Sequence, residues 1–190
     1  MTTSFKRAAA AGFTLIELLI VVIILAIISA IAIPQFSAAT SDAQQSAADA
    51  NLAAVRNAIE LYRAQHAGNV YPGVKASSGG SCSSGAGQAD AGSEQAFKDQ
   101  LQYPSNKNGQ TCAIADAEYR YGPYLRQGIP NNPFTENNSV RVEDQGTALV
   151  AATGSGKGWA YDTKSGEFIL DAKVDDGTGA DAGAPAGDGA

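Results

Sequence analysis

One long apolar run, residues 13–33, constrains this chain more than any other feature. It reads FTLIELLIVVIILAIISAIAI. A helix of this length reaches about 31 Å, and the hydrocarbon core of a bilayer is about 30 Å thick. Lys6 and Arg7 precede the run closely, which predicts a cytoplasmic N-terminus. We therefore expect one membrane span, with the rest of the chain lying outside the inner membrane.

Three kinds of membrane segment could carry such a run. A secretory signal peptide could be cut after Ala32, but its apolar stretch is usually only about 7–15 residues long. The others are an uncleaved anchor and a leader that is cut before the run. Glu17 distinguishes them, because a carboxylate within an apolar span costs about 2.5–3.5 kcal/mol on insertion. A plain anchor gains nothing from that cost, whereas a segment that must find a partner in the membrane does.

Residues 12–22, GFTLIELLIVV, resemble the processing motif of the type IV prepilin family. In that family a membrane aspartyl peptidase cuts after the glycine and methylates the new amine of the phenylalanine. The resemblance implies a leader of residues 1–12, cleavage between Gly12 and Phe13, and methylation of Phe13. It also makes Glu17 the fifth mature residue, as the family pattern requires.

The resemblance implies a role for Glu17 in polymerisation. The freed amine of Phe13 would be positively charged near neutral pH, and pairing it with Glu17 of a neighbouring copy neutralises both charges and fixes the axial register. The aliphatic side chains between Leu15 and Leu25 would then pack helix against helix. The implied partners are copies of the chain, other pilin-like subunits, the prepilin peptidase, the inner membrane and its assembly platform.

The helix should continue well beyond the apolar run. Pro34 lacks an amide donor for the carbonyl of Ala30, so it either kinks the helix or marks where the chain leaves the bilayer. We expect residues 13–34 to be the membrane half and residues 35–67 the amphipathic half, with Arg63 and His66 as positive charges in the last turn. An alanine-rich stripe suits close helix contacts, and a bulkier stripe suits packing on a sheet; the bulkier stripe comprises Leu52, Val55, Ile59 and Tyr62.

Residues 68–172 are expected to form a head outside the membrane, and residues 173–190 a disordered acidic tail. Ser93 should cap a short helix that ends near Tyr103. Strand signals occur at Val140 and Val142, over residues 147–152, and in a hairpin over residues 159–170. The predicted fold class is α+β, type IV pilin-like, with a long N-terminal helix packed against a small antiparallel sheet of three or four strands.

Cysteine and acid content suggest an exported structural domain. Cys82 and Cys112 are expected to form a disulfide that closes a 31-residue loop, with two free thiols as the alternative. The net charge is −6, or −8 without residues 1–12, which argues against binding to nucleic acid. We expect no cofactor, although Asp171, Asp175 and Asp176 could gather calcium instead of forming a solvated acidic tail. Asp162 and Glu167 are interpreted as surface charges of the hairpin.

The chain is interpreted as a structural subunit and not as an enzyme. Ile59–Tyr62, followed by Tyr71-Pro72, resembles the major pseudopilin of type II secretion, in which a Tyr-Pro dipeptide follows the helix. The leading hypothesis is therefore a pseudopilin that supports protein export across the outer membrane. The alternative is a type IV pilus subunit for adhesion, motility or DNA uptake. A membrane-anchored periplasmic enzyme is a third hypothesis, but no nucleophile, base or metal constellation in the sequence supports it.

Overall fold

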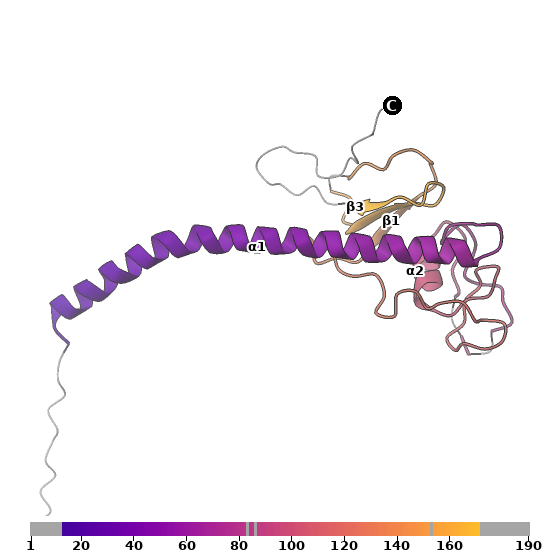
Figure 1. Cartoon of the computed structure of the whole chain (residues 1–190), viewed down its shortest axis with the longest axis horizontal. Helices are drawn as coiled ribbons and strands as arrows, with labels where there is room; N and C mark the ends of the chain where they lie inside the picture. The colour runs from indigo at the N-terminus through magenta and orange to yellow at the C-terminus, as the bar shows by residue number, and fades with distance from the viewer. Residues whose placement is uncertain (1–12, 83, 86, 153, 172–190) are drawn as a thin grey trace, which may run out of the picture. The chain divides into compact units, whose positions relative to one another are not determined.

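The computed structural model describes residues 13–82, 84–85, 87–152 and 154–171 (Figure 1). The elements are α1 (Leu15–Gln65), α2 (Glu94–Gln102), β1 (Val140–Glu143), β2 (Trp159–Asp162) and β3 (Phe168–Leu170). The chain divides into two compact units, Met1–Ala43 and Gln44–Ala190, which are described separately. The predicted leader and the predicted tail lie outside the described residues. A long apolar helix with a small sheet is the α+β, pilin-like fold class expected from the sequence.

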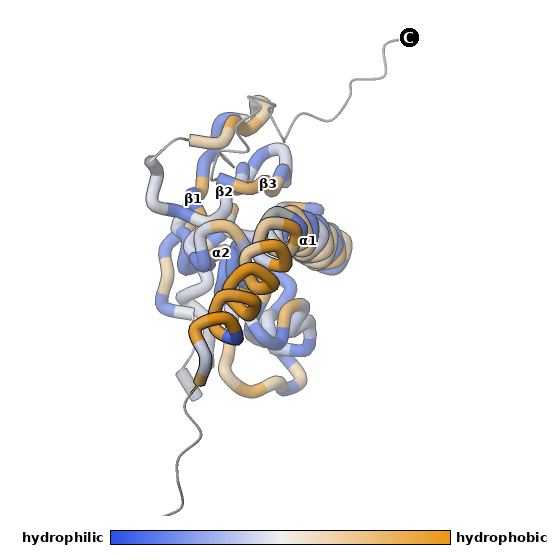
Figure 2. The backbone as a smooth tube through the Cα atoms, turned by 90° about the vertical axis from the view of Figure 1, so that its left-hand side faces the viewer, coloured by the Kyte–Doolittle hydropathy of each residue, from blue (hydrophilic) through white to orange (hydrophobic). Residues whose placement is uncertain are grey.

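In the first unit, the part of α1 from Leu15 to Ile33 is apolar on every side apart from Glu17 and Ser29. Its large aliphatic side chains from Leu15 to Ile33 are 47–84% exposed. Figure 2 shows most of this part of α1 in the hydrophobic colour, with a hydrophilic patch near its start. Among the described residues, α1 is the helix that is long and apolar enough to cross a membrane. The helix runs through Pro34 without ending, and the kink expected there stays a prediction.

In the second unit, one face of α1 is buried. Val55, Ile59 and Tyr62 are at most 1% exposed, and Leu52 packs half-buried beside them. The spacing of three and four residues places these side chains on one face, as the bulkier stripe predicted. The alanines at positions 47, 50 and 54 lie on the exposed side.

The short helix α2 forms where the sequence predicted it. Ser93 is its N-cap, and the Ser93 hydroxyl accepts a 3.1 Å hydrogen bond from the Ala96 amide. Phe97 and Leu101, one turn apart, are fully buried. The cap fixes where the helix begins, and the two apolar residues fix which face turns to the core.

The sheet has the order β1-β2-β3. The predicted hairpin is present: β2 and β3 are antiparallel, with Trp159 opposite Leu170. The prediction of a wholly antiparallel sheet was wrong, because β1 pairs with β2 in parallel. The connection over residues 144–158 is long enough for the crossover that a parallel pair requires.

The apolar run at residues 147–152, expected as a strand, is irregular. Two of its backbone amides donate to carboxylates and not to a neighbouring strand. The Leu149 amide donates to Glu167 Oε2 at 2.7 Å, and the Ala152 amide donates to Asp171 Oδ1 at 2.9 Å. Because these amides are satisfied by side chains, the segment covers the sheet without joining it.

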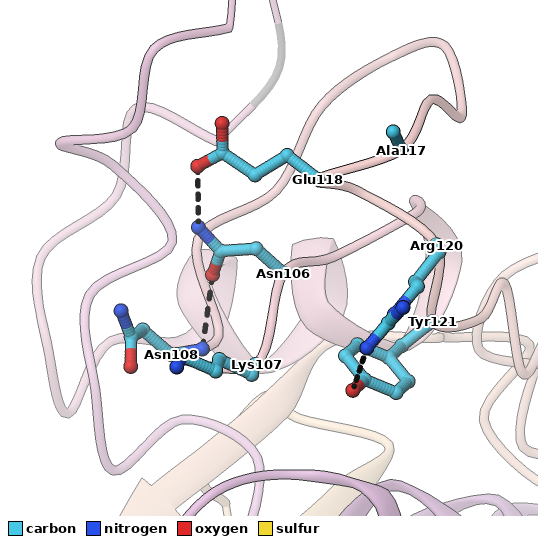
Figure 3. A pocket seen from close by; sticks show the side chains of 7 residues that line it. All are labelled: Asn106, Lys107, Asn108, Ala117, Glu118, Arg120 and Tyr121. Carbon is cyan, nitrogen blue, oxygen red and sulfur yellow. Dashed lines mark hydrogen bonds between the residues drawn. The ribbon is translucent and has the colours of Figure 1, made fainter.

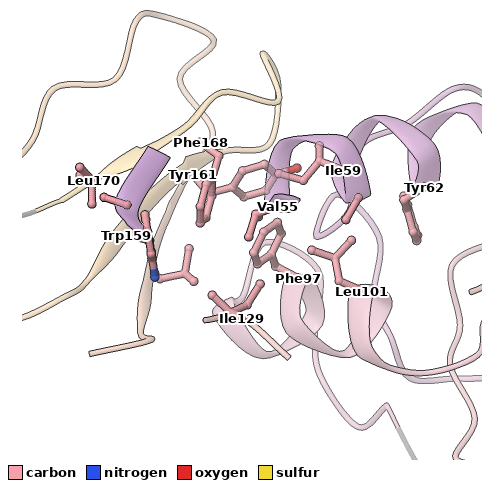
Figure 4. Close-up of a cluster of buried hydrophobic side chains, with 13 residues drawn as sticks. Val55, Ile59, Tyr62, Phe97, Leu101, Ile129, Trp159, Tyr161, Phe168 and Leu170 are labelled. Carbon is pink, nitrogen blue, oxygen red and sulfur yellow. The ribbon is translucent and has the colours of Figure 1, made fainter. Parts of the chain in front are cut away.

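Both faces of the sheet are covered. Trp159, Tyr161 and Phe168 pack with Phe97 in the main core (Figure 4), and the ring centroids of Phe97 and Tyr161 lie 4.1 Å apart. On the opposite face, a second cluster comprises Leu149, Ala160 and Ile169. This double coverage explains why every residue of β2 is buried.

Candidate functional site

The residues of the predicted processing and assembly motif lie at the start of α1. Thr14 precedes the helix, and its hydroxyl oxygen accepts a 3.2 Å hydrogen bond from the Glu17 amide. The Glu17 carboxylate in turn accepts two hydrogen bonds of 2.8 Å through Oε2, one from the Thr14 amide and one from the Thr14 hydroxyl. This reciprocal arrangement is a capping box.

The capping box fixes the carboxylate at the helix N-terminus. Both donors use Oε2, and within the described part of the chain Oε1 accepts no hydrogen bond. The partial positive charge of the helix N-terminus also favours a carboxylate there. This arrangement was not predicted, although the Thr-x-x-Glu spacing of Thr14 and Glu17 is its usual signal.

Phe13 lies directly before the capping box and is 84% exposed. Its side chain and the Glu17 carboxylate therefore belong to the same end of α1. Gly12, the other residue of the predicted cleavage site, lies outside the described residues. The structure tests neither cleavage nor methylation, so both stay predictions.

His66 lies buried in the core directly after α1, and not as a charged residue in the last helical turn. Its side chain is buried, stacked on Tyr62 with ring centroids 3.7 Å apart. Nδ1 lies 2.8 Å from the Tyr62 carbonyl oxygen, and Nε2 lies 3.0 Å from Ser105 Oγ. Burial lowers the pKa of His66, although the carbonyl of Tyr62 acts in the opposite direction. His66 is therefore a core residue, and its burial opposes the positive charge that was expected there.

Asp162 is also buried, contrary to its interpretation as a surface charge. Oδ1 accepts hydrogen bonds from the amides of Lys164 and Ser165, at 2.6 and 3.1 Å. Oδ2 accepts from the amides of Gln145 and Gly146, at 3.2 and 2.7 Å. Burial by itself raises the pKa of Asp162, but these four donors together hold it below the ordinary value. The carboxylate thus joins the hairpin turn to the loop that follows β1.

Cys82 and Cys112 form a disulfide, with their Cα atoms 5.5 Å apart. The bond closes the loop that contains α2. This loop is further held by Gln100, whose fully buried carboxamide accepts from the Gly73 amide at 2.7 Å and donates to the carbonyls of Lys75 and Gly109, both at 2.9 Å. The head therefore relies on covalent and polar cross-links as well as on apolar packing.

Asp171, one of the three candidate calcium ligands, forms a salt bridge with Arg141. Arg141 donates to both of its carboxylate oxygens, at 2.9 Å from Nε and 2.7 Å from Nη2. Among the residues that the structure describes, no three His, Cys, Asp or Glu side chains gather as a metal site. Asp175 and Asp176 lie outside the described residues, so calcium binding there stays untested.

Comparison with known proteins begins at the same N-terminal segment. Residues 7–33 match the family described as the prokaryotic N-terminal methylation motif. The capping box and the apolar half of α1 lie within the matched residues.

The chain is also similar to one named pilin. It is 49% identical over 59 residues to the type IV narrow pilus major component PilA5 of Thermus thermophilus. The similar segment is 31% of this chain and 51% of that protein, so the chain spans about half the length of this relative. No solved structure matches the chain. The motif and the relative together support a type IV pilin-like subunit.

Proposed function

We propose that this chain is a subunit of a type IV pilus, stored in the inner membrane and polymerised through α1 after residues 1–12 are removed. The observation that carries the proposal is Glu17, a carboxylate fixed at the start of an apolar helix inside a methylation motif. The named relative is a pilus component, which favours the pilus over the secretion pseudopilin, the leading hypothesis from the sequence.

Storage in the membrane follows from the first unit. Its apolar helix inserts with the N-terminus in the cytoplasm and the head in the periplasm. The capping box lowers the cost of burying Glu17 in lipid, because one carboxylate oxygen already has two donors. The second oxygen remains without a donor within the described residues, so the carboxylate is only half satisfied.

Processing supplies the missing partner. Cleavage by the prepilin peptidase converts the Phe13 amide nitrogen into a positively charged amine. The amine of one subunit then binds Oε1 of Glu17 on the next, without displacing Thr14. An ion pair in a low-dielectric environment requires close geometry, so it sets the axial register while the aliphatic side chains supply the packing.

The test has two parts. Mass spectrometry of the mature chain should find Phe13 at the N-terminus with one added methyl group. The Glu17→Ala variant should insert into the membrane but form few pili, whereas Glu60→Ala, at an exposed carboxylate paired with Arg63, should assemble normally. Removal of residues up to Ala32, or normal piliation of the Glu17 variant, would contradict the proposal.

One observation favours a second candidate, the type II secretion pseudopilin. Tyr71-Pro72 follows α1, as in the major pseudopilins that the sequence resembles. The Pro72 carbonyl accepts a 2.8 Å hydrogen bond from Tyr161, which ties this dipeptide to β2. Immunogold electron microscopy and gene deletion separate the candidates. The pilus proposal predicts labelled filaments outside the cell. Absence of labelled filaments from native cells, together with loss of protein secretion on deletion of the gene, favours the pseudopilin.

A further inference from the structure

His66 is the single histidine of the chain, and directly after α1 it contacts two segments of the head. Its side chain is 5% exposed. Nε2 lies 3.0 Å from Ser105 Oγ, and the imidazole ring lies 5.3 Å from the Tyr121 ring, centroid to centroid. This junction belongs to the second unit and takes no part in the proposed polymerisation.

The two segments are joined to each other as well as to His66. Two backbone hydrogen bonds connect Ser105 and Tyr121, at 2.8 and 3.0 Å. Asn106 adds a further link, because its Nδ2 donates to Glu118 Oε1 at 3.3 Å (Figure 3). Both segments line a polar pocket of about 260 Å³. A change in the bond between His66 and Ser105 therefore affects both segments and the pocket between them.

The hydrogen bonds of His66 define its neutral form. The Tyr62 carbonyl, 2.8 Å from Nδ1, can only accept, so Nδ1 carries the hydrogen. Nε2 is then the acceptor of the neutral ring, and the Ser105 hydroxyl donates to it. A proton taken up from solvent binds Nε2, which thereby becomes a donor to Ser105 Oγ. The hydroxyl hydrogen must then turn away, and the Tyr121 carbonyl, 3.5 Å from Oγ, is in place to accept it.

The surroundings of His66 disfavour the charged ring. Burial is the main cause that lowers the pKa of His66, and the cation of Lys75 lowers it further, while the carbonyls of Tyr62 and Asn106 act in the opposite direction. Within the described part of the chain, the ring forms no ion pair with a carboxylate. Three tyrosine rings lie around the imidazole, with centroids 3.7–6.3 Å away; they are Tyr62, Tyr121 and Tyr124.

We propose that His66 is a pH-sensitive contact, whose protonation loosens the attachment of the segments around Ser105 and Tyr121 to the end of α1. Proton uptake places a charge in a buried aromatic cluster beside a lysine, and it reverses the direction of the hydrogen bond with Ser105. The folded chain therefore binds this proton less readily than the unfolded chain. The stabilisation is complete above the unfolded pKa, about 6.5, and is lost as the pH falls from there to the folded pKa.

The test is an NMR titration of the isotope-labelled full chain in detergent micelles, from about pH 8 to about pH 4. Because the chain has one histidine, its imidazole Cε1–H signal reports the protonation of His66 directly. The signal should titrate with a midpoint below 6.5, and the amide signals of residues 105–107 and 121–124 should shift with the same midpoint. The amides of β2 and β3 should not follow it.

Two lysine variants separate the electrostatic cause from packing. Lys75→Gln removes the cation that acts on His66, so the midpoint of the imidazole should rise. Lys164→Gln, at an exposed lysine in the turn between β2 and β3, is the matched control and should leave the midpoint unchanged. Native-like amide spectra of β2 and β3 show that each variant is folded.

His66→Gln keeps a side chain that forms hydrogen bonds but cannot take up the proton. Its amides at residues 105–107 and 121–124 should lack the transition seen in the native chain. Below about pH 6.5 the unfolding equilibrium of the native chain should change by up to about tenfold per pH unit more than that of the variant, followed in urea by tryptophan fluorescence.

Several outcomes would overturn the proposal. They are an imidazole midpoint at or above 6.5, no titration down to about pH 4, and a titration that the amides of residues 105–107 and 121–124 do not follow. Equal midpoints in Lys75→Gln and Lys164→Gln would overturn it as well. The native chain and the two lysine variants decide the matter even where His66→Gln does not fold, and none of these measurements depends on filament formation.

Discussion

The buried carboxylate of Asp162 provides a sharp test of how the head is held together. Asp162→Asn keeps the size of the side chain and replaces one of its two oxygens by an NH₂ group. Two of the four backbone donors then face another donor. Hydrogen bonds to a charged group contribute about 1.5–3 kcal/mol each, so two lost bonds predict a fall of about 3–6 kcal/mol in the free energy of unfolding. Entry of water into the loop favours the lower end, about 3 kcal/mol.

Trp159 makes this loss measurable. It is the single tryptophan of the chain, fully buried in β2 and stacked on Phe168 at 5.2 Å between ring centroids. Urea unfolding of the full chain in detergent, followed by tryptophan fluorescence, reports the free energy directly. Asp144→Asn is the matched control, because Asp144 is 77% exposed and its ion pair among the described residues is with the exposed Lys164, at 3.3 Å. Such surface pairs contribute about 0–1 kcal/mol.

The direction of the pKa shift of Asp162 predicts how the stabilisation by its carboxylate varies with pH. The pKa of Asp162 is held below its ordinary value in the folded chain, so its stabilisation is complete above the unfolded pKa and is lost as the pH falls through the folded pKa. The difference between native and Asp162→Asn chains should therefore shrink on acidification below about pH 4. A loss at neutral pH no larger than that of Asp144→Asn, or a difference independent of pH, would refute the role given to the four donors.

Three further predictions concern the assembly site, the core and the disulfide. Thr14→Val removes the hydroxyl of the capping box and should reduce the number of pili seen by electron microscopy, whereas Thr14→Ser should not; equal counts would show that the capping box is dispensable. Ile59→Ala should lower the free energy of unfolding by about 2–5 kcal/mol, while Leu61→Ala, on the exposed face, should change it little, and similar losses would contradict the buried face assigned to α1. Cys82→Ser should lower stability by about 3–4 kcal/mol at most, measured against native protein with and without reductant, and no difference between those samples would exclude a stabilising disulfide.

Local sequence patterns were sufficient for much of the fold. The stripe at Leu52, Val55, Ile59 and Tyr62 predicted the buried face of α1, since side-chain spacing alone sets which residues share a helix face. Ser93 predicted the start of α2 in the same way. The hairpin of β2 and β3 was predicted because a short turn joins strands that are adjacent in sequence.

Features that depend on distant segments were not predicted. Alternation at Val140 and Val142 indicates a strand, but it does not say whether the partner runs parallel. The burial of Asp162 depends on the amides of residues 145 and 146 folding over it, and that of His66 on Ser105 and Tyr121. The capping box of Thr14 and Glu17 is different, because its pattern is local and could have been recognised.

The most direct test of the account is the distance between the Phe13 amine nitrogen and the Glu17 side-chain carboxyl carbon on different subunits. Filaments grown from a mixture of two subunit populations, one ¹⁵N-labelled at phenylalanine and one ¹³C-labelled at the glutamate side-chain carboxyl, would report it by solid-state NMR. Because each label is carried by a different population, only an intermolecular contact gives a signal. The account predicts dipolar dephasing between the amine nitrogen and the Glu17 carboxyl, at about 4 Å or less. Absence of dephasing in well-ordered filaments would contradict it.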